Sequence, residues 1–581
     1  MTKYYNFGKL YIELDRGDKM RKIKLKYGDG YIEDIEPGTP LYEIAHRVKK
    51  DYKYKIVAAK LGSNVTNLNT LVSSNDRVEF YDMSSPFGNR IYSRSLELLA
   101  NVASRKLFGK DTDVLIDYSI ENGIHCEIVG KKINSISVQK IEEEMKELVS
   151  KKLPIESVIV DRIEAIRYLK KTGQADKSDI IRYLTADTIM VNHLDDMYDY
   201  FFGPLVHNTE VLTKFLLKYS GENTFIIVYP TKDNPNVIKE YINHPLTDKT
   251  YKDFSQWGQL VGIPTVSVLN KIITTGLAEA VVRFFEAHYN EEISNVIESV
   301  VKKRNKVKMI LLAGPSSSGK TTTSMKLGLY LRVKGIVFKK ISLDDYFIDR
   351  EYCPKDEKGN YDFSDIKALD VKLFQKQLKD MLDGKKVLMP TYNFIVGKKE
   401  FKDNYIQLNE GEMLVIEGIH TLNEELTKMV PREEKFKIFQ SPIAGLKIDN
   451  HNRLHATDIR KIRRIVRDNT FRGTSAEETL SMWSNVDREV EKNIYPFQDD
   501  VDAIINSSLG YELNVLKIYA EPLLFGIDID SPEYPEAKRL INLLRGFLTI
   551  SSDIVPRDSI LREFIGGSIF KEYKIREEKR K

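Results

Sequence analysis

The most informative stretch of the chain reads Val307-Lys308-Met309-Ile310-Leu311-Leu312-Ala313-Gly314-Pro315-Ser316-Ser317-Ser318-Gly319-Lys320-Thr321. Its first half is largely apolar, which indicates a buried strand. The second half fits the pattern G-x-x-x-x-G-K-T, and the residues from about Thr321 to Val333 favour a helix that Gly335 ends. A glycine-rich turn between a buried strand and a helix is the arrangement that cradles phosphate groups.

The residues of this loop have separate chemical tasks. The glycines let main-chain N–H groups turn towards phosphate oxygens, and the helix start adds about half a positive charge. Lys320 can reach the β- and γ-phosphates, and Thr321 can offer its hydroxyl to Mg²⁺. We therefore predict ATP and Mg²⁺ as cofactors, with nucleotide contacts from Gly314, Pro315, Ser316, Ser317, Ser318, Gly319, Lys320, Thr321 and Thr322.

Apolar segments after the loop predict the rest of a sheet. Ile336–Leu343 reads as the next strand, and Met413–Ile416 and Lys435–Phe439 are further candidates. A strand, a crossover helix and another strand indicate parallel pairing. We predict an α/β fold with a doubly wound parallel sheet, whose ligands bind at the carboxyl ends of the strands.

Length and composition narrow the class of protein. A chain of 581 residues suggests about three or four domains. The 89 basic and 85 acidic side chains nearly balance, which argues against nucleic acid or an anionic membrane as an obligatory partner. Two cysteines make a disulfide scaffold improbable, and no apolar run is long enough to cross a bilayer. We predict a cytoplasmic protein that binds no membrane.

The N-terminal half has a mixed pattern. Residues 22–84 read as short strands with one helix near Leu41–Lys49, which Thr39 can cap. Further helices are predicted at Ser93–Leu107 and, with an exposed surface, at Lys131–Lys152. Ser267–Arg304 reads as a long helical region that leads into the phosphate-binding half.

Six segments that include the glycine loop resemble, in order, the uridine kinase branch of the phosphoribulokinase/uridine kinase family. Together they cover about residues 306–524. After the loop come Ser342-Leu343-Asp344-Asp345-Tyr346-Phe347, Tyr361-Asp362-Phe363 through Asp370, Pro390-Thr391-Tyr392-Asn393-Phe394, Ile416-Glu417-Gly418-Ile419-His420, and Asp458–Asp468 with Arg472-Gly473.

The resemblance implies roles for the charged residues. Asp344 matches the catalytic carboxylate that accepts a proton from a substrate hydroxyl, with Asp345 as a competing candidate. Thr321, Asp344 and Glu417 are the implied contacts of Mg²⁺. Lys320, Arg467 and Arg472 are implied in catalysis, where guanidinium groups suit phosphate oxygens, and Arg464 matches an arginine implicated at the substrate.

The substrate side is less well matched. Tyr392 corresponds to the aromatic residue that contacts a nucleobase, and the implied substrate contacts also include Tyr346, Phe347 and Asp365, with Asp362 as an alternative to Asp365. Three family positions differ: a base-reading histidine is Gly397, the D-H-P element is Ser364-Asp365-Ile366, and the last lid arginine is Thr474. Phosphoryl transfer is therefore better supported than pyrimidine specificity.

The N-terminal half resembles two parts of threonyl-tRNA synthetases. Residues 22–84 are similar to the β-grasp TGS domain, and the following region is similar to the α+β editing-type domain. That domain's three histidines and one cysteine align with Arg94, Leu98, Phe201 and Leu205, none of which can serve as a neutral nitrogen or thiolate ligand. We expect a more apolar pocket without editing chemistry; RNA binding, small-molecule sensing and a scaffold role remain open.

These observations predict four regions and one leading function. The regions are 1–84 (TGS-like), 85–270 (editing-like), 271–304 (helical connector) and 305–581 (kinase-like). The leading function is an ATP-dependent kinase, a homo-oligomer that transfers phosphate to the 5′-hydroxyl of a uridine- or cytidine-like nucleoside. The alternatives are a kinase for another nucleoside or small alcohol, and a nucleotide-dependent regulatory or RNA-sensing protein.

Overall fold

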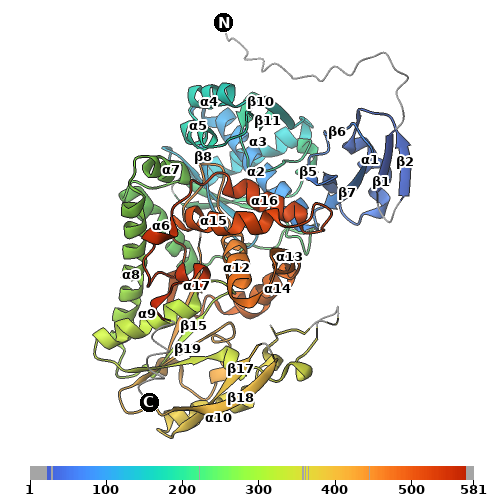
Figure 1. Cartoon of the computed structure of the whole chain (residues 1–581). Coiled ribbons are helices and arrows are strands. Elements are labelled where there is room, and N and C mark those ends of the chain that lie inside the picture. The colour runs from blue at the N-terminus through green and yellow to red at the C-terminus, as the bar shows by residue number, and fades with distance from the viewer. Residues whose placement is uncertain are drawn as a thin grey trace.

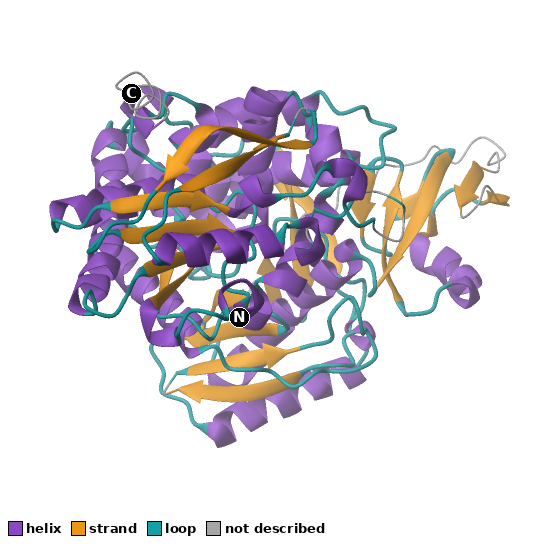
Figure 2. Ribbon diagram, turned by 90° about the horizontal axis from the view of Figure 1, so that it is seen from below, coloured by secondary structure: helices purple, strands orange, loops and turns teal. Residues whose placement is uncertain are grey.

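The computed structural model describes residues 23–27, 31–221, 223–355, 359, 361–363, 365–394, 396–443 and 445–570. A small N-terminal module projects from one side of a larger body (Figure 1). In the body, strands lie between layers of helices (Figure 2). No helix in the described part of the chain is long and apolar enough to cross a membrane. Ser364 lies outside the described residues.

The N-terminal module is a mixed sheet with one helix across it. Its strand order is β2-β1-β7-β4-β5, in which β1 and β7 are parallel and the other neighbouring pairs are antiparallel. The strands are β1 (Ile23–Tyr27), β2 (Tyr31–Ile35), β4 (Ile56–Leu61), β5 (Asn64–Thr66) and β7 (Asp76–Asp82), with the short pair β3 (Thr39–Pro40) and β6 (Leu71–Val72) alongside.

The helix of this module, α1 (Leu41–Val48), confirms the predicted element but not its cap. Leu41, Ile44 and Val48 are buried and face the sheet. Thr39 lies in β3, and its hydroxyl donates to the Glu36 carbonyl oxygen at 2.7 Å. Pro40 takes the capping position without a side-chain hydrogen bond, because pairing with β6 holds Thr39 in extended geometry.

The middle region contains two antiparallel sheets and several helices. The sheet orders are β13-β14-β9-β8 and β10-β11-β12. The strands are β8 (Val114–Ile120), β9 (Gly123–Ile128), β10 (Glu156–Asp161), β11 (Thr188–Leu194), β12 (Met197–Asp199), β13 (Leu216–Gly221) and β14 (Thr224–Val228). The helices are α2 (Pro86–Phe108), α3 (Ser135–Ser150), α4 (Arg162–Lys171), α5 (Ala175–Arg182) and α6 (Pro245–Leu260).

Two predicted helical regions differ from the structure in detail. The charged helix α3 is not simply exposed, because Val138, Ile141 and Leu148 are buried on one side. The long region before the glycine loop is two helices, α7 (Val266–Thr274) and α8 (Ala278–Lys302). They are separated at Gly276, whose φ of +82° suits glycine and cannot continue a helix.

The C-terminal half is built on the predicted parallel sheet. Its order is β16-β19-β15-β20-β21, and all neighbouring strands are parallel. The strands are β15 (Met309–Ala313), β16 (Phe338–Ser342), β19 (Met413–Gly418), β20 (Lys435–Ser441) and β21 (Ala503–Asn506), with a hairpin of β17 (Val387–Asn393) and β18 (Lys398–Ile406) beside them.

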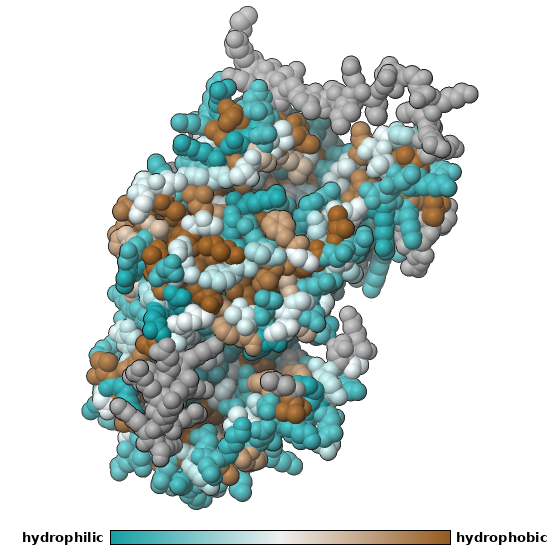
Figure 3. Space-filling view, in the orientation of Figure 1, coloured by the Kyte–Doolittle hydropathy of each residue, from teal (hydrophilic) through white to brown (hydrophobic). Residues whose placement is uncertain are grey.

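Helix α9 (Lys320–Val333) packs directly against this sheet. The other described helices of this half are α10 (Val371–Leu382), α11 (Glu424–Thr427), α12 (Ala456–Arg472), α13 (Ala476–Ser481), α14 (Trp483–Asn493), α15 (Glu512–Phe525), α16 (Tyr534–Leu544) and α17 (Arg562–Ile565). On the face shown in Figure 3, hydrophilic residues cover the N-terminal module, and hydrophobic residues gather in the middle.

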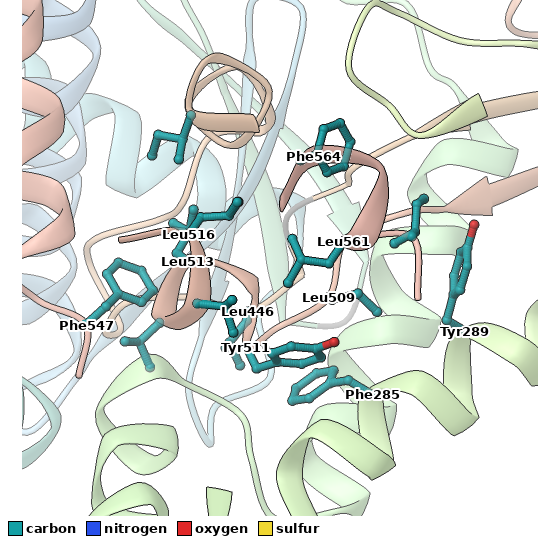
Figure 4. Close-up of a cluster of buried hydrophobic side chains, with 14 of the residues drawn as sticks. Phe285, Tyr289, Leu446, Leu509, Tyr511, Leu513, Leu516, Phe547, Leu561 and Phe564 are labelled. Atoms are coloured by element: carbon teal, nitrogen blue, oxygen red, sulfur yellow. The ribbon is translucent and has the colours of Figure 1, made fainter. Parts of the chain in front are cut away.

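The two halves share one hydrophobic core. A continuous cluster of buried side chains runs from Val160 in the middle region to Phe564 in α17. Figure 4 shows part of it, with Phe285 of α8 beside Tyr511 near the start of α15. Burial of apolar surface is the main favourable contribution to folding, so this core joins the middle region firmly to the parallel-sheet half.

A segment between β20 and α12 passes through the middle region. Lys447 pairs with Asp117 at 2.7 Å, and the Asn450 carbonyl oxygen accepts the Ile116 N–H at 2.8 Å. The ring of His451 is buried between the carboxylates of Asp113 and Asp199, at 2.7 and 2.6 Å. The chain that leads into α12 is therefore held by residues of the other half.

Candidate active site

The glycine loop between β15 and α9 is tightly packed. A Cβ on Gly314 would lie 2.2 Å from the Gln440 carbonyl oxygen, and one on Gly319 would lie 2.2 Å from Ile560 Cδ1. Gly319 has φ +86°, which favours glycine, and Ser317 has φ +62°. Left-handed backbone at a residue with a side chain costs about 1–3 kcal/mol and is concentrated at functional sites.

The start of α9 offers main-chain donors. Among the described residues, no acceptor contacts the N–H groups of Lys320 and Thr321. The Thr322 N–H and hydroxyl donate to Glu563 of α17 at 3.0 and 2.8 Å. Because a helix start carries a partial positive charge, Glu563 lies where an anionic group is favoured.

Three predicted site residues meet at the carboxyl ends of adjacent strands. Glu417 near the end of β19 pairs with Ser342 of β16 on one side and with Leu312 of β15 on the other. Asp344 follows β16 in a one-turn 3₁₀ helix, η3 (Leu343–Tyr346). Lys320 begins α9 directly after the glycine loop. The register of the sheet thus places the two carboxylates and the ammonium group at the same edge.

Each of these groups changes the ionisation of the others. Although the Asp344 side chain reaches solvent, surrounding protein atoms desolvate it, and this effect together with the charge of Glu417 raises its pKa to about 6. Lys320 opposes that shift. Desolvation lowers the pKa of Lys320, while Glu417, Asp344 and Glu489 of α14 favour its charged form. The site therefore holds a carboxylate that can exchange a proton near neutral pH.

Helix α12 lies directly against the glycine loop. Arg460 donates to the Ser316 carbonyl oxygen at 3.0 Å, and Arg464 donates to the Ser316 hydroxyl at 3.2 Å. Arg463 donates to the Ser317 carbonyl oxygen at 3.3 Å but is completely buried and paired with Glu512 at 2.6 Å. Arg460 and Arg464 are thus placed beside the phosphate-binding loop, whereas Arg463 is part of the core.

One carboxylate organises the remaining arginines of α12. Asp468 contacts Arg464 at 3.1 Å, Arg467 at 2.7 Å and Arg472 at 3.5 Å. Burial works against its ionisation, but the three guanidinium groups outweigh this and lower the pKa of Asp468. The positive charge of Arg472 also acts on Asp344. The predicted catalytic arginines therefore surround the same edge of the sheet.

Aromatic rings cluster next to this edge. Tyr392 of β17 is buried, and its ring lies edge-on to Phe347 and Phe394 at centroid distances of 5.6 and 5.0 Å. Phe363 packs against Phe347 at 5.4 Å. Such a cluster can provide an apolar surface for a flat substrate. Tyr346 instead is completely buried in the core, and its own ring partner is Phe374.

The other predicted substrate residues have structural partners. The Tyr346 hydroxyl donates to Gln377 at 2.8 Å, and its ring packs against Phe374. Asp365 accepts the Lys367 N–H at 2.9 Å and pairs with Lys492 of α14 at 3.1 Å. Tyr346 therefore anchors the segment after β16 to α10, and Asp365 holds its own loop against α14.

The structure adds residues to which the sequence assigned no role. Glu489 and Glu563 come from helices far along the chain, and no motif marks either one. His420 belongs to the quoted Ile416–His420 segment; it is buried, and no partner contacts either ring nitrogen among the described residues. Burial lowers its pKa to about 4, so it is neutral. In the sequence, the only signal for a role of His420 is its position in the Ile416–His420 segment.

The four positions aligned with synthetase ligands separate into two environments. Leu98 and Leu205 are completely buried in an apolar cluster, as expected for lost polar chemistry. Arg94 and Phe201 line a cavity that also contains other cationic side chains. Arg94 brings a positive charge into this cavity, whose lining is otherwise largely apolar, and the loss of editing chemistry stays a prediction.

Comparisons with known proteins agree with this division of the chain. Residues 309–510 match the sequence profile of the Phosphoribulokinase / Uridine kinase family. The N-terminal part is similar to threonine–tRNA ligases: that of an Exiguobacterium species is 28% identical over 202 residues, or 34% of this chain and 31% of the ligase. The threonine–tRNA ligase of Francisella tularensis subsp. novicida is 27% identical over 201 residues, which are 34% of this chain and 32% of the ligase. The chain thus spans about a third of each ligase.

Two solved structures with partial similarity to this chain are named as kinases in their titles. A possible uridine kinase from Bacillus stearothermophilus is 18% identical and covers 36% of this chain and 97% of its own, with a TM-score of 0.25. Phosphoribulokinase from Rhodobacter spheroides is 16% identical, with a TM-score of 0.24; the alignment covers 34% of this chain and 68% of the phosphoribulokinase chain. Residues 309–510 thus match the profile of the phosphoribulokinase/uridine kinase family, and they follow an N-terminal part that is similar to threonine–tRNA ligases.

Proposed function

We propose that this protein is an ATP-dependent kinase that phosphorylates the hydroxyl group of a small molecule, with a nucleoside 5′-hydroxyl as the leading acceptor. One observation carries the proposal: Lys320, Asp344 and Glu417 lie together at the ends of three adjacent parallel strands. Ligands bind at this edge in open α/β sheets. The arginines of α12 lie against the same loop.

The geometry supports in-line transfer. The acceptor oxygen forms a bond to the γ-phosphorus, the bond from that phosphorus to the β–γ bridging oxygen breaks, and ADP leaves. Asp344 takes the proton that the acceptor hydroxyl loses. Lys320 and the α12 guanidinium groups neutralise charge on the transferring phosphoryl group, so catalysis rests mainly on positioning and electrostatics.

The donor set also fits Mg²⁺. The Thr321 side chain is exposed at the start of α9, and the carboxylates of Asp344 and Glu417 lie at the same edge. Hydroxyl and carboxylate oxygens are the ligands that Mg²⁺ prefers. When bound, the ion would neutralise charge on the β- and γ-phosphates.

The acceptor would lie near the aromatic cluster of Phe347, Phe363, Tyr392 and Phe394. A flat base stacked there would be held by apolar contact, above all with the exposed ring of Phe394. Gly397 replaces a base-reading histidine of the resembled family, so a different nucleoside or another small alcohol is the alternative acceptor.

The direct test is consumption of ATP by the full chain against a panel of nucleosides and small alcohols, with Mg²⁺ present. We expect turnover with at least one acceptor and none with Lys320→Ala, which lacks the phosphate-contacting ammonium. A chain that binds ATP but turns over with no acceptor would refute the kinase and favour the alternative.

That alternative is a nucleotide-dependent regulatory or RNA-sensing protein. It draws support from the similarity of the N-terminal part to threonine–tRNA ligases and from the core that joins the two halves. Such a protein would keep its response to ATP when Asp344 is changed to Asn, whereas a kinase would lose turnover.

Activity should depend on pH through Asp344. A general base must be ionised, and the pKa of Asp344 is raised to about 6, so kcat/KM should rise about tenfold per pH unit below about pH 6 and level off above it. The measurement is kcat/KM for ATP·Mg²⁺ from about pH 5 to about pH 8 at subsaturating ATP·Mg²⁺, because this constant reports the free enzyme, in which Asp344 has the raised pKa. A flat profile across that range would contradict the assigned role.

Glu563 should weaken nucleotide binding in the present arrangement. Its carboxylate accepts both the Thr322 N–H and hydroxyl, at the helix start where phosphate charge is expected. Glu563→Gln removes that negative charge, and a gain of about 1 kcal/mol would tighten the dissociation constant of ATP about fivefold. Equilibrium titration measures it, with the exposed Glu164→Gln as the charge-matched control; weaker binding by Glu563→Gln would contradict the interpretation.

A further inference from the structure

A cavity of about 320 Å³ lies away from the glycine loop, where three parts of the chain meet. Its walls come from β5 of the N-terminal module, from the middle region and from α16 of the C-terminal half. In Figure 1, α16 lies between the N-terminal module and α12. Volumes of this size are at the lower end of those that hold small ligands.

The charge of the lining has one sign. Five cationic side chains contribute to it, and its described lining residues include no Asp or Glu; the five are Arg90, Arg94, Lys538, Arg539 and Arg545. Arg539 is neutralised by Asp458 at 2.6 Å and Glu536 at 2.7 Å, and Arg90 lies 3.8 Å from Glu536. Carboxylates outside the cavity therefore offset the positive charges of Arg539 and Arg90. Among the described residues, no carboxylate forms an ion pair with Arg94, Lys538 or Arg545.

Arg94 is the best placed of these three cations; it forms no ion pair among the described residues, although the charge of the buried Glu97 favours its ionised form. Its Nη1 donates to the Pro204 carbonyl oxygen at 3.1 Å, and a Cβ on Gly203 would lie 2.6 Å from that nitrogen. Gly203 has φ +135°, and because it lacks a side chain, the Arg94 guanidinium group can lie against its backbone. Burial lowers the pKa of Arg94 to about 10, so the charged group lacks much of its hydration and would gain from an anionic partner.

Lys538 and Arg545 complete the charged wall from α16 and the residue after it. The Lys538 ammonium contacts the Asn64 side-chain oxygen of β5, and Arg545 contacts the Asn542 side-chain oxygen at 3.1 Å. Both partners are neutral amides. Apolar side chains also line the cavity, including Phe87, Ile91, Met190, Phe202 and Pro535.

We propose that this cavity binds a small organic anion: a phosphate or carboxylate group held by Arg94, Lys538 and Arg545, attached to a flat or apolar body that packs against Phe87 and Phe202. Guanidinium groups bind both kinds of oxyanion bidentately. A single pocket of about 320 Å³ favours a small molecule over a polyanion, which needs an extended basic surface. The proposal does not depend on the proposed kinase activity.

The cavity is also linked to the phosphate-binding loop. Arg539 of its wall pairs with Asp458 of α12, and Lys461 of α12 pairs with Glu536 of α16 at 2.5 Å. The same helix carries Arg460 and Arg464, which contact Ser316 in the loop. The cavity wall and the phosphate-binding loop therefore share α12 as a common support.

Calorimetric titration of the full chain with phenyl phosphate, benzoate and benzyl alcohol tests the proposal. We expect one of the two anions to bind at least about tenfold more tightly than benzyl alcohol, and their comparison distinguishes phosphate from carboxylate. Arg94→Gln and the exposed Arg545→Gln should each weaken that binding about tenfold, while Lys170→Gln, an exposed lysine on α4, should not change it. Arg545→Gln keeps the test valid if Arg94→Gln does not fold.

Lys320→Ala separates this cavity from the glycine loop. Binding of the preferred anion should persist in Lys320→Ala, and it should be lost if the loop is the true site. Equal binding of benzyl alcohol, unchanged affinity in both arginine variants, or binding only of an RNA oligonucleotide would overturn the proposal.

Discussion

Replacing Asp344 with Asn is expected to lower kcat by about 10²–10⁴-fold while leaving the dissociation constant of ATP within about threefold of its original value. The carboxylate lies at the end of β16 beside Glu417 and Lys320, and its raised pKa suits proton acceptance near neutral pH. Asparagine preserves the shape of the side chain but cannot accept the proton. Steady-state kinetics and equilibrium ATP binding measure the two quantities separately.

The neighbouring carboxylate provides the control. Asp345 accepts the Tyr392 N–H at 3.3 Å, so it holds the strand of the aromatic cluster. Asp345→Asn should therefore lower kcat less than about tenfold. If Asp345→Asn loses the activity and Asp344→Asn keeps it, the roles of the two aspartates are exchanged; if both keep it, the proposed base is wrong.

Replacing Arg463 with Met is expected to destabilise the protein by about 3–5 kcal/mol. Arg463 is completely buried, pairs with Glu512 at 2.6 Å and donates to the Ser507 carbonyl oxygen at 2.6 Å. Its loss leaves the Glu512 carboxylate buried without its partner. The shift of the midpoint of urea unfolding measures the effect, and binding of ATP should weaken as well because Arg463 supports Ser317 of the loop.

Two comparisons make this prediction specific. Arg283→Met removes an exposed arginine that pairs with Glu279 at 3.2 Å, and it should cost less than about 1 kcal/mol. The double variant Arg463→Met, Glu512→Met removes both buried charges and should recover part of the lost stability. If Arg463→Met is no more harmful than Arg283→Met, the buried pair does not have the proposed structural role.

Local sequence patterns were sufficient to predict the strands of the phosphate-binding half. A hydrophobic strand, a glycine turn and a helix must pack as a parallel unit, because the right-handed crossover leaves few alternatives. For that reason β15, β16, β19 and β20 all appear within a few residues of their predicted positions. The family resemblance then placed Asp344 and Glu417 at strand ends, where the register of the sheet brings them together.

Contacts between distant segments could not be read in this way. Glu563 reaches the start of α9, Glu489 faces Lys320, and Arg94 shares a cavity with Arg545, yet hundreds of residues separate the members of two of these pairs. Such contacts depend on how whole elements pack, and a charged residue on a helix looks the same in sequence whether it faces solvent or a partner. The sequence therefore determined the phosphate-binding chemistry, and the packing of the two halves determined which other charges surround it.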